Sequence, residues 1–112
     1  MDRHRQPISW SPEARADLAG IWDYYREVAG LNTAERISRE MNRTCNILSD
    51  HPFVGRSRSE IRAGLRSLVA NPHVIFYRVT DHDAPEIVRI VDERQDIDAT
   101  FSAQGVEHVF PN

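Results

Sequence analysis

Residues 64–79, with the sequence GLRSLVANPHVIFYRV, constrain the fold of this chain more than any other stretch. The pattern predicts a β-hairpin, with one strand over 65–70, a tight turn at Asn71-Pro72 and a second strand over 73–79. β-Branched and aromatic residues are densest in the second strand, and such residues favour extended backbone. They fall on both of its faces, so we expect this strand in the middle of a sheet that is covered on each side.

Two amphipathic helices are predicted before the hairpin. The first begins after Ser11, a good N-cap, and ends at Gly30, where a left-handed residue can close a helix. The second begins at Asn32, with Glu35 as its capping-box partner, and ends near Asp50 because Pro52 follows. Apolar residues recur at helical spacing in both: Ala14, Leu18, Ile21, Trp22, Tyr25 and Val28 in the first, and Ala34, Ile37, Met41, Cys45 and Leu48 in the second.

Three further segments complete the expected fold. An extended segment covers 7–10, a long arginine-containing connection covers 51–63, and a last strand covers 86–92 after a turn at 81–85. The order β-α-α-β-β-β predicts an α+β domain, in which an N-terminal helical hairpin packs on a small, mostly antiparallel sheet. We expect residues 1–101 to form this single domain and residues 102–112 to form a C-terminal tail.

The composition narrows the class of protein. The 112 residues carry a formal net charge of −3, and all 14 basic residues are arginine. A protein that mainly holds a phosphate backbone is usually basic, so the charge argues against a nucleic acid as sole partner. The sequence contains neither a secretory signal pattern nor a run of membrane-spanning length, and we expect a cytoplasmic protein. Cys45 lies on the apolar side of the second helix and is predicted to be a buried structural thiol.

No motif in the sequence points to an enzyme. A phosphate-binding loop, a dinucleotide fingerprint and a nucleophile elbow are all missing, and the histidines do not have metal-ligand spacing. We therefore expect no catalytic residue, no cofactor and no metal.

Arginines on the later strands remain as candidates, because a guanidinium group suits both phosphates and acidic protein surfaces. Arg66, Arg78 and Arg89 lie one on each strand, and Arg94 follows the last strand. Two interpretations stay open: a cluster on one sheet face, or pairing with nearby carboxylates such as Asp92, Glu93 or Asp96. Tyr24 lies off the apolar stripe of the first helix and is a candidate contact for a partner.

Several segments together resemble one known family. They are the helix SPEARADLAGIWDYYREVAG, the spacing of Pro52, Gly55 and Arg56 before GLRSL, the strand IFYRV, and the closing EIVRIVDERQDI. In this order and spacing they resemble the ParE branch of the RelE/ParE toxin superfamily, over roughly residues 8–101.

The resemblance implies the toxin of a type II toxin–antitoxin system. Such toxins poison DNA gyrase by binding and stabilising its cleaved-DNA complex, with no chemistry of their own. The implied partner is a ParD-like antitoxin, a ribbon-helix-helix DNA-binding protein that wraps the toxin and forms with it a hetero-oligomer on promoter DNA. The candidate target-binding residues are Arg66, Arg78, Arg89, Arg94 and Asp96, and the candidate antitoxin-binding residues are Tyr24, Arg56, Arg58 and Arg62.

Two alternatives stay open. One is a ribosome-dependent messenger RNA endoribonuclease of the RelE type, which would draw its cationic and acid–base groups from Arg62, Arg66, Arg89 and His73. The net charge counts against it. The other is a non-toxic module that sequesters an antitoxin, because Asp92 and Glu93 add negative charge where the target-binding surface is expected.

Overall fold

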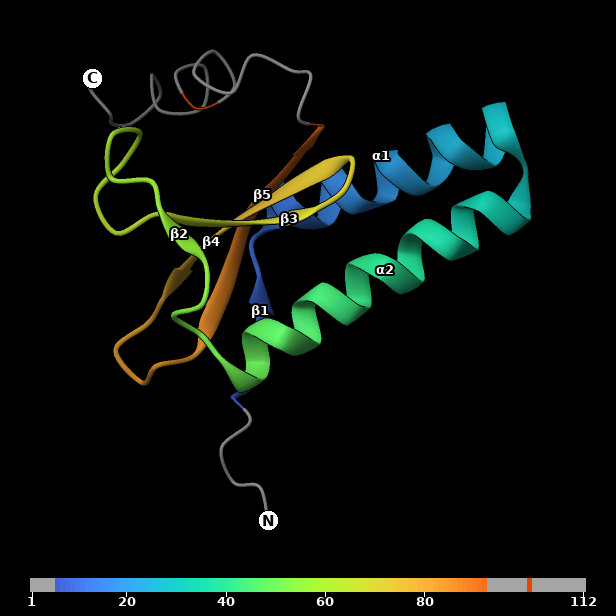
Figure 1. The fold of residues 1–112 in the computed structure, drawn as a ribbon. Helices are drawn as coiled ribbons and strands as arrows, with labels where there is room; N and C mark the ends of the chain where they lie inside the picture. Colours follow the sequence, from blue (N-terminus) through green and yellow to red (C-terminus); the bar gives the residue numbers. More distant parts are fainter. Residues whose placement is uncertain (1–5, 93–100, 102–112) are drawn as a thin grey trace.

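The computed structural model describes residues 6–92 and Phe101 (Figure 1). Within them lie two helices and five strands: β1 (Ser9–Trp10), α1 (Pro12–Ala29), α2 (Leu31–Asp50), β2 (Arg56–Ser57), β3 (Arg66–Ala70), β4 (His73–Val79) and β5 (Pro85–Asp92). The helices form a hairpin against one face of a single sheet, so the predicted α+β fold is confirmed. The predicted division at residue 101 stays a prediction, and the tail 102–112 lies outside the described residues.

The sheet has the strand order β1-β5-β4-β3-β2. As predicted, β4 is central, paired antiparallel with β3 and β5, while β1 runs parallel to β5 at one edge. The other edge is β2, which pairs antiparallel with β3 and was not expected inside the connection 51–63. Its two residues are both exposed, so they give no period-two pattern from which a strand could be recognised.

The two helix starts differ in how they are capped. Ser11 Oγ accepts a hydrogen bond from the Ala14 amide at 2.9 Å and donates to the Val88 carbonyl at 2.8 Å, so the predicted cap also fixes α1 to β5. Gly30 has the expected positive φ of 96°. The predicted start at Asn32, with a capping box, is wrong: α2 begins at Leu31 without a side-chain cap. Gly30 is both the C-cap of α1 and the N-cap of α2. No other residue remains between the helices whose side chain could cap α2.

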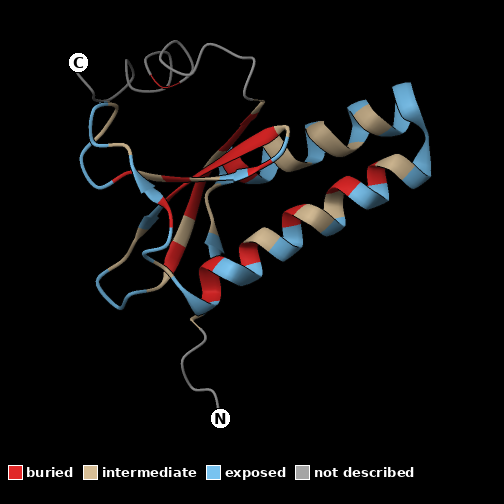
Figure 2. Cartoon of the chain, in the orientation of Figure 1, coloured by how far each residue is buried: buried red, intermediate tan, exposed pale blue. Residues whose placement is uncertain are grey.

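The sheet is covered on both faces, as predicted, by two separate clusters of buried side chains. Buried positions recur along the central strands and along α2 (Figure 2). The cluster under the helices contains Ala14, Met41, Cys45, Leu48, Ala70, Ile75, Tyr77, Ile87 and Ile90. The cluster on the opposite face contains Leu65, Val74, Phe76, Val88, Val91 and Phe101, with Ile61 packed against it.

The helices contribute unequally to this core. The predicted stripe of α2 is buried, but in α1 Ala14 is the single fully buried residue. Trp22 is half-buried and Val28 is 60% exposed, so the apolar stripe predicted for α1 leaves the core toward the end of the helix. The reason is geometric, because the connected ends of α1 and α2 extend beyond the sheet (Figure 1).

The thiol of Cys45 is buried, as predicted, and burial raises its pKa to about 11. Across the described residues, neither helix combines the length and apolar character that a membrane span requires.

Candidate functional site

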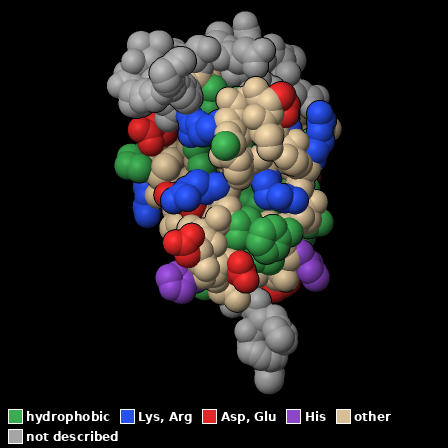
Figure 3. Space-filling model, turned by 90° about the vertical axis from the view of Figure 1, so that its left-hand side faces the viewer, with side chains coloured by type: hydrophobic (Ala, Val, Ile, Leu, Met, Phe, Trp, Pro, Cys, Tyr) green, Lys and Arg blue, Asp and Glu red, His purple; other side chains and the backbone are tan. Residues whose placement is uncertain are grey.

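The structure does not gather the strand arginines into one cluster. Arg66 pairs with Tyr77 and lies on the helical side of the sheet, whereas Arg78 follows Val74 and Phe76 on the opposite face. Arg89 is held by α1. On the face shown in Figure 3, arginine side chains lie apart, with acidic and apolar groups between them. Arg94 and Asp96, the remaining target-binding candidates, lie outside the described residues.

Arg89 forms part of a clamp between α1 and β5. Its Nε and Nη2 donate to the Asp17 carboxylate at 2.7 and 2.9 Å, and the Ile90 amide donates to the same carboxylate at 2.8 Å. The pairing of β5 with β4 shifts register between Phe76 and Tyr77. Val88 has no partner residue on β4 there, so β5 contains a β-bulge at Val88. The Asp17 hydrogen bonds raise the pKa of Arg89. The Arg89 charge is therefore neutralised within the fold.

Arg78 is exposed and pairs with Glu86, the residue opposite it on β5, with 2.5 Å between Nε and Oε1. Pairing with carboxylates is thus the interpretation that the structure supports for Arg78 and Arg89. Glu86 pairs with Arg78 and Asp17 pairs with Arg89. Of the acids predicted as partners, Glu93 and Asp96 lie outside the described residues.

Arg66 belongs to a compact arrangement around the loop before β2. Its guanidinium lies 5.5 Å from the centre of the Phe53 ring, and its Nη2 donates to the Phe53 carbonyl at 3.1 Å. Beneath it, the buried Tyr77 hydroxyl accepts from the Gly55 amide at 2.8 Å. A Cβ at Gly55 would lie 2.4 Å from that hydroxyl oxygen. Position 55 therefore has no room for a side chain.

The antitoxin-binding candidates occupy two regions. Tyr24 is 55% exposed on α1, as predicted. Arg56 is exposed on β2, but Arg58 and Arg62 are half-buried on the sheet face away from the helices. Their guanidinium groups lie 5.4 Å from the Phe76 ring centre and 5.3 Å from the Phe101 ring centre. These two arginines cover aromatic core residues, so part of their role is structural.

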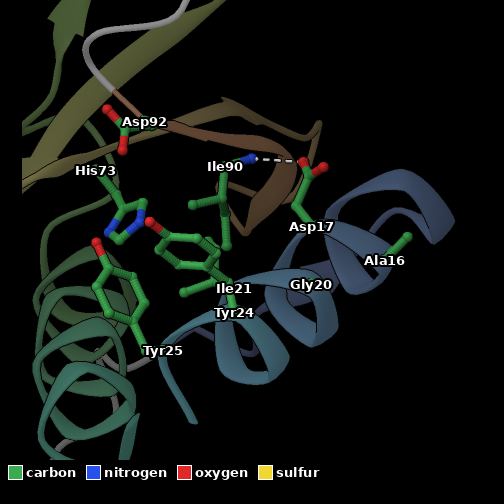
Figure 4. A pocket seen from close by; sticks show the side chains of 9 residues that line it. All are labelled: Ala16, Asp17, Gly20, Ile21, Tyr24, Tyr25, His73, Ile90 and Asp92. Carbon is green, nitrogen blue, oxygen red and sulfur yellow. Dashed lines mark hydrogen bonds between the residues drawn. The ribbon is translucent and has the colours of Figure 1, made fainter. Parts of the chain in front are cut away.

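A pocket of about 620 Å³ lies between α1 and the adjoining ends of β4 and β5 (Figure 4). Its lining residues are Ala16, Asp17, Gly20, Ile21, Tyr24, Tyr25, His73, Ile90 and Asp92. Tyr25 meets Tyr24 edge to face at 5.1 Å between ring centres and His73 at 6.0 Å. Sequence reasoning missed this pocket because its walls come from three separate elements. The small residues Ala16 and Gly20, one turn apart before Tyr24, were the available signal.

The four residues considered for RNA cleavage do not converge. His73 is 2% exposed and packs against Tyr25, and Arg89 is held by Asp17. Arg66 and Arg62 lie over different rings, those of Phe53 and Phe101. Among the described residues, no three His, Cys, Asp or Glu side chains are placed to hold a metal ion.

Solved structures with the same fold define the class of protein. A structure titled "Chromosomal ParDE TA system from P. aeruginosa" matches with a TM-score of 0.68 and 25% identity, covering 80% of this chain and 97% of that chain. The toxin–antitoxin complex RelBE2 from Mycobacterium tuberculosis matches with a TM-score of 0.57 and 20% identity, covering 79% and 98%. The fold is that of toxins from toxin–antitoxin pairs.

The sequence comparisons narrow the class to a family. A family model described as "ParE toxin of type II toxin-antitoxin system, parDE" matches residues 8–97. Toxin ParE1 of Mycobacterium tuberculosis is 39% identical over 79% of this chain and 90% of the relative. Toxin ParE1 of Caulobacter vibrioides is 34% identical over the same shares. The chain belongs to the ParE toxin family of type II toxin–antitoxin systems.

Proposed function

We propose that this toxin inhibits DNA gyrase by binding and stabilising its cleaved-DNA complex, and that a ParD-like antitoxin neutralises it. It acts in the cytoplasm, where both partners would be found, and carries out no chemistry itself. Toxin and antitoxin form a hetero-oligomer that binds their promoter. Membership of the ParE family, over nearly all of the described residues, is the main support for this proposal.

One observation favours binding over RNA cleavage. Cleavage requires cationic and acid–base groups around a single phosphate. In the structure Arg89 is bound to Asp17 and His73 is buried. The guanidinium groups of Arg62 and Arg66 lie over two different rings, those of Phe101 and Phe53. The net charge of −3 also gives little attraction to ribosomal RNA.

The first test is supercoiling by purified gyrase, titrated with the toxin alone and with toxin preincubated with the protein encoded beside it. The proposal expects loss of supercoiling, accumulation of cleaved DNA and relief by the antitoxin. Arg94→Ala is expected to weaken inhibition. Arg39→Ala is the matched control, because Arg39 is exposed on α2 and was not a candidate.

The same preparations are added to translating ribosomes, and messenger RNA is mapped for cuts. Cleavage there, with gyrase unaffected, would overturn the proposal in favour of the endoribonuclease. Inactivity in both assays, with retained binding to the antitoxin, would identify a sequestering module.

A further inference from the structure

Two large apolar side chains are exposed at consecutive positions in the loop between α2 and β2. Phe53 is 57% exposed and Val54 is 51% exposed. The loop follows the end of α2 that lies away from the junction of the helices (Figure 1). Neither side chain belongs to the two buried clusters described for the sheet. A single exposed apolar residue is ordinary, but large adjacent ones mark an interaction surface when the fold holds them in place.

The loop is held in place from below and from the side. The Gly55 amide, directly after Val54, donates to the buried Tyr77 hydroxyl, and position 55 has no room for a side chain. Arg66 donates to the Phe53 carbonyl and lies over the Phe53 ring. The two apolar side chains are therefore presented on a fixed backbone, so little further ordering is required when they bind.

Arg66 carries a charge that the fold does not neutralise. Arg78 and Arg89, on the neighbouring strands, are each paired with a carboxylate. Within the described residues Arg66 has no carboxylate partner, and its hydrogen bond is to the neutral carbonyl of Phe53. A guanidinium group held over an exposed ring can direct its remaining N–H groups to a carboxylate on a partner.

The partner of this surface needs an apolar recess for Phe53 and Val54 and a carboxylate for Arg66. Clustered aromatic and arginine side chains in fixed positions are typical of the hot spots that bind a folded protein. A segment that folds as it binds gains instead from a long surface that it can wrap. The phosphate backbone of a duplex would pair with Arg66 but would leave the two apolar side chains in water.

We propose that Phe53, Val54 and Arg66 form the anchor by which the toxin binds the protein part of its target, gyrase. The two apolar side chains enter a recess on gyrase, and the Arg66 guanidinium pairs with a carboxylate at the edge of that recess. This assignment rests on the proposed function, which supplies gyrase as the partner. Of the arginines predicted to bind the target, Arg66 is the one in the anchor, and Phe53 and Val54 are additions that the sequence did not single out.

The anchor is tested by titrating gyrase supercoiling with toxin variants whose folding is checked by circular dichroism. Phe53→Ala and Arg66→Gln are each expected to raise the half-inhibiting concentration roughly tenfold or more. The matched controls are Val69→Ala, 58% exposed on β3, and Arg39→Gln, exposed on α2. Both should stay within about twofold of the unchanged toxin. If Phe53→Ala does not fold, Val54→Ser replaces it.

Tyr77 is tested as a positioning residue. Tyr77→Phe releases the Gly55 amide and loosens the loop without changing its exposed side chains. Inhibition is expected to weaken several-fold in the unchanged toxin and clearly less in the Phe53→Ala background, because part of the anchor is already missing there. The same factor in both backgrounds would indicate a general loss of stability and would overturn the positioning role.

The partner is identified with the photo-crosslinking residue p-benzoylphenylalanine at position 54, and at position 69 as the control. Gyrase with DNA, the antitoxin and the toxin alone are offered separately. A crosslink from position 54 to a gyrase subunit, absent from position 69, is expected. Crosslinks from position 54 to the antitoxin, to DNA or to a second copy of the toxin, without one to gyrase, would overturn the assignment.

Failure of the anchor differs from failure of the proposed function. If Phe53→Ala and Arg66→Gln inhibit gyrase as well as the unchanged toxin does, the anchor is wrong and the proposed function stands. If the unchanged toxin leaves gyrase unaffected, the proposed function fails, and gyrase as the partner of the anchor fails with it.

Discussion

The clamp at Asp17 gives the sharpest test of how the fold is held together. Replacing Asp17 by alanine leaves the Arg89 guanidinium and the Ile90 amide without the carboxylate that accepts three hydrogen bonds from them. The side chains of Arg89 and Asp17 are 21% and 15% exposed, so water replaces these bonds incompletely. We therefore expect Asp17→Ala to be more damaging than the loss of an ordinary surface charge.

The expected loss in the free energy of unfolding is about 3 kcal/mol, since hydrogen bonds to charged groups are strong and a half-buried charge loses its partner. For a chain of 112 residues this corresponds to a fall in Tm of about 12 °C. Arg89→Ala is expected to cost a similar amount. In the double variant the two losses should overlap, giving a coupling free energy of about 2 kcal/mol.

Urea and thermal unfolding, followed by circular dichroism, measure these values. Arg78→Ala is the control, because Arg78 is exposed and its pair with Glu86 should contribute less than about 1 kcal/mol. A loss at Asp17→Ala no larger than that at Arg78→Ala would refute the clamp as a stabilising feature. A coupling near zero between Asp17 and Arg89 would do the same.

Three further predictions concern buried groups. Because the pKa of Cys45 is about 11 in the fold and near 9.0 when exposed, the folded thiol keeps its proton longer as pH rises. Stability should thus fall by about 2 to 3 kcal/mol between pH 9 and 11, and Cys45→Ala should flatten this slope in urea unfolding. Gly55→Ala should lower Tm markedly, since its Cβ would collide with the Tyr77 hydroxyl and the Ser67 carbonyl; an unchanged Tm would contradict the close contact. Tyr77→Phe should cost about 1 to 3 kcal/mol, measured in the same way, by leaving the buried Gly55 amide unbonded.

The elements whose patterns are local were predictable from the sequence. The β4 strand carries its own pattern of β-branched and aromatic residues, and the start of α1 carries its own cap in Ser11. The edge strand β2 was missed because two exposed residues leave no pattern. Gly30 was recognised as the end of α1, but not as the start of α2, since its backbone performs both functions.

The arrangement of the arginines could not be read from the sequence. Spacing placed Arg66, Arg78 and Arg89 on three neighbouring strands, which is correct. The register shift in β5 and the partner of Arg89, 72 residues away in Asp17, are set by tertiary packing. The pocket beside Tyr24 was hidden for the same reason, because three elements meet to form it.

The extension of the helical hairpin beyond the sheet has a consequence for local opening. Amides near the junction of α1 and α2 should exchange with deuterium far faster than those of β4, because few buried side chains hold that end in place. A partner that covers Val28 and Leu31 would reduce this difference in exchange rate. It would slow exchange at the junction of the helices and leave the slow exchange of β4 unchanged. Binding of a partner at this end would therefore be detected in the least anchored turns of the helices.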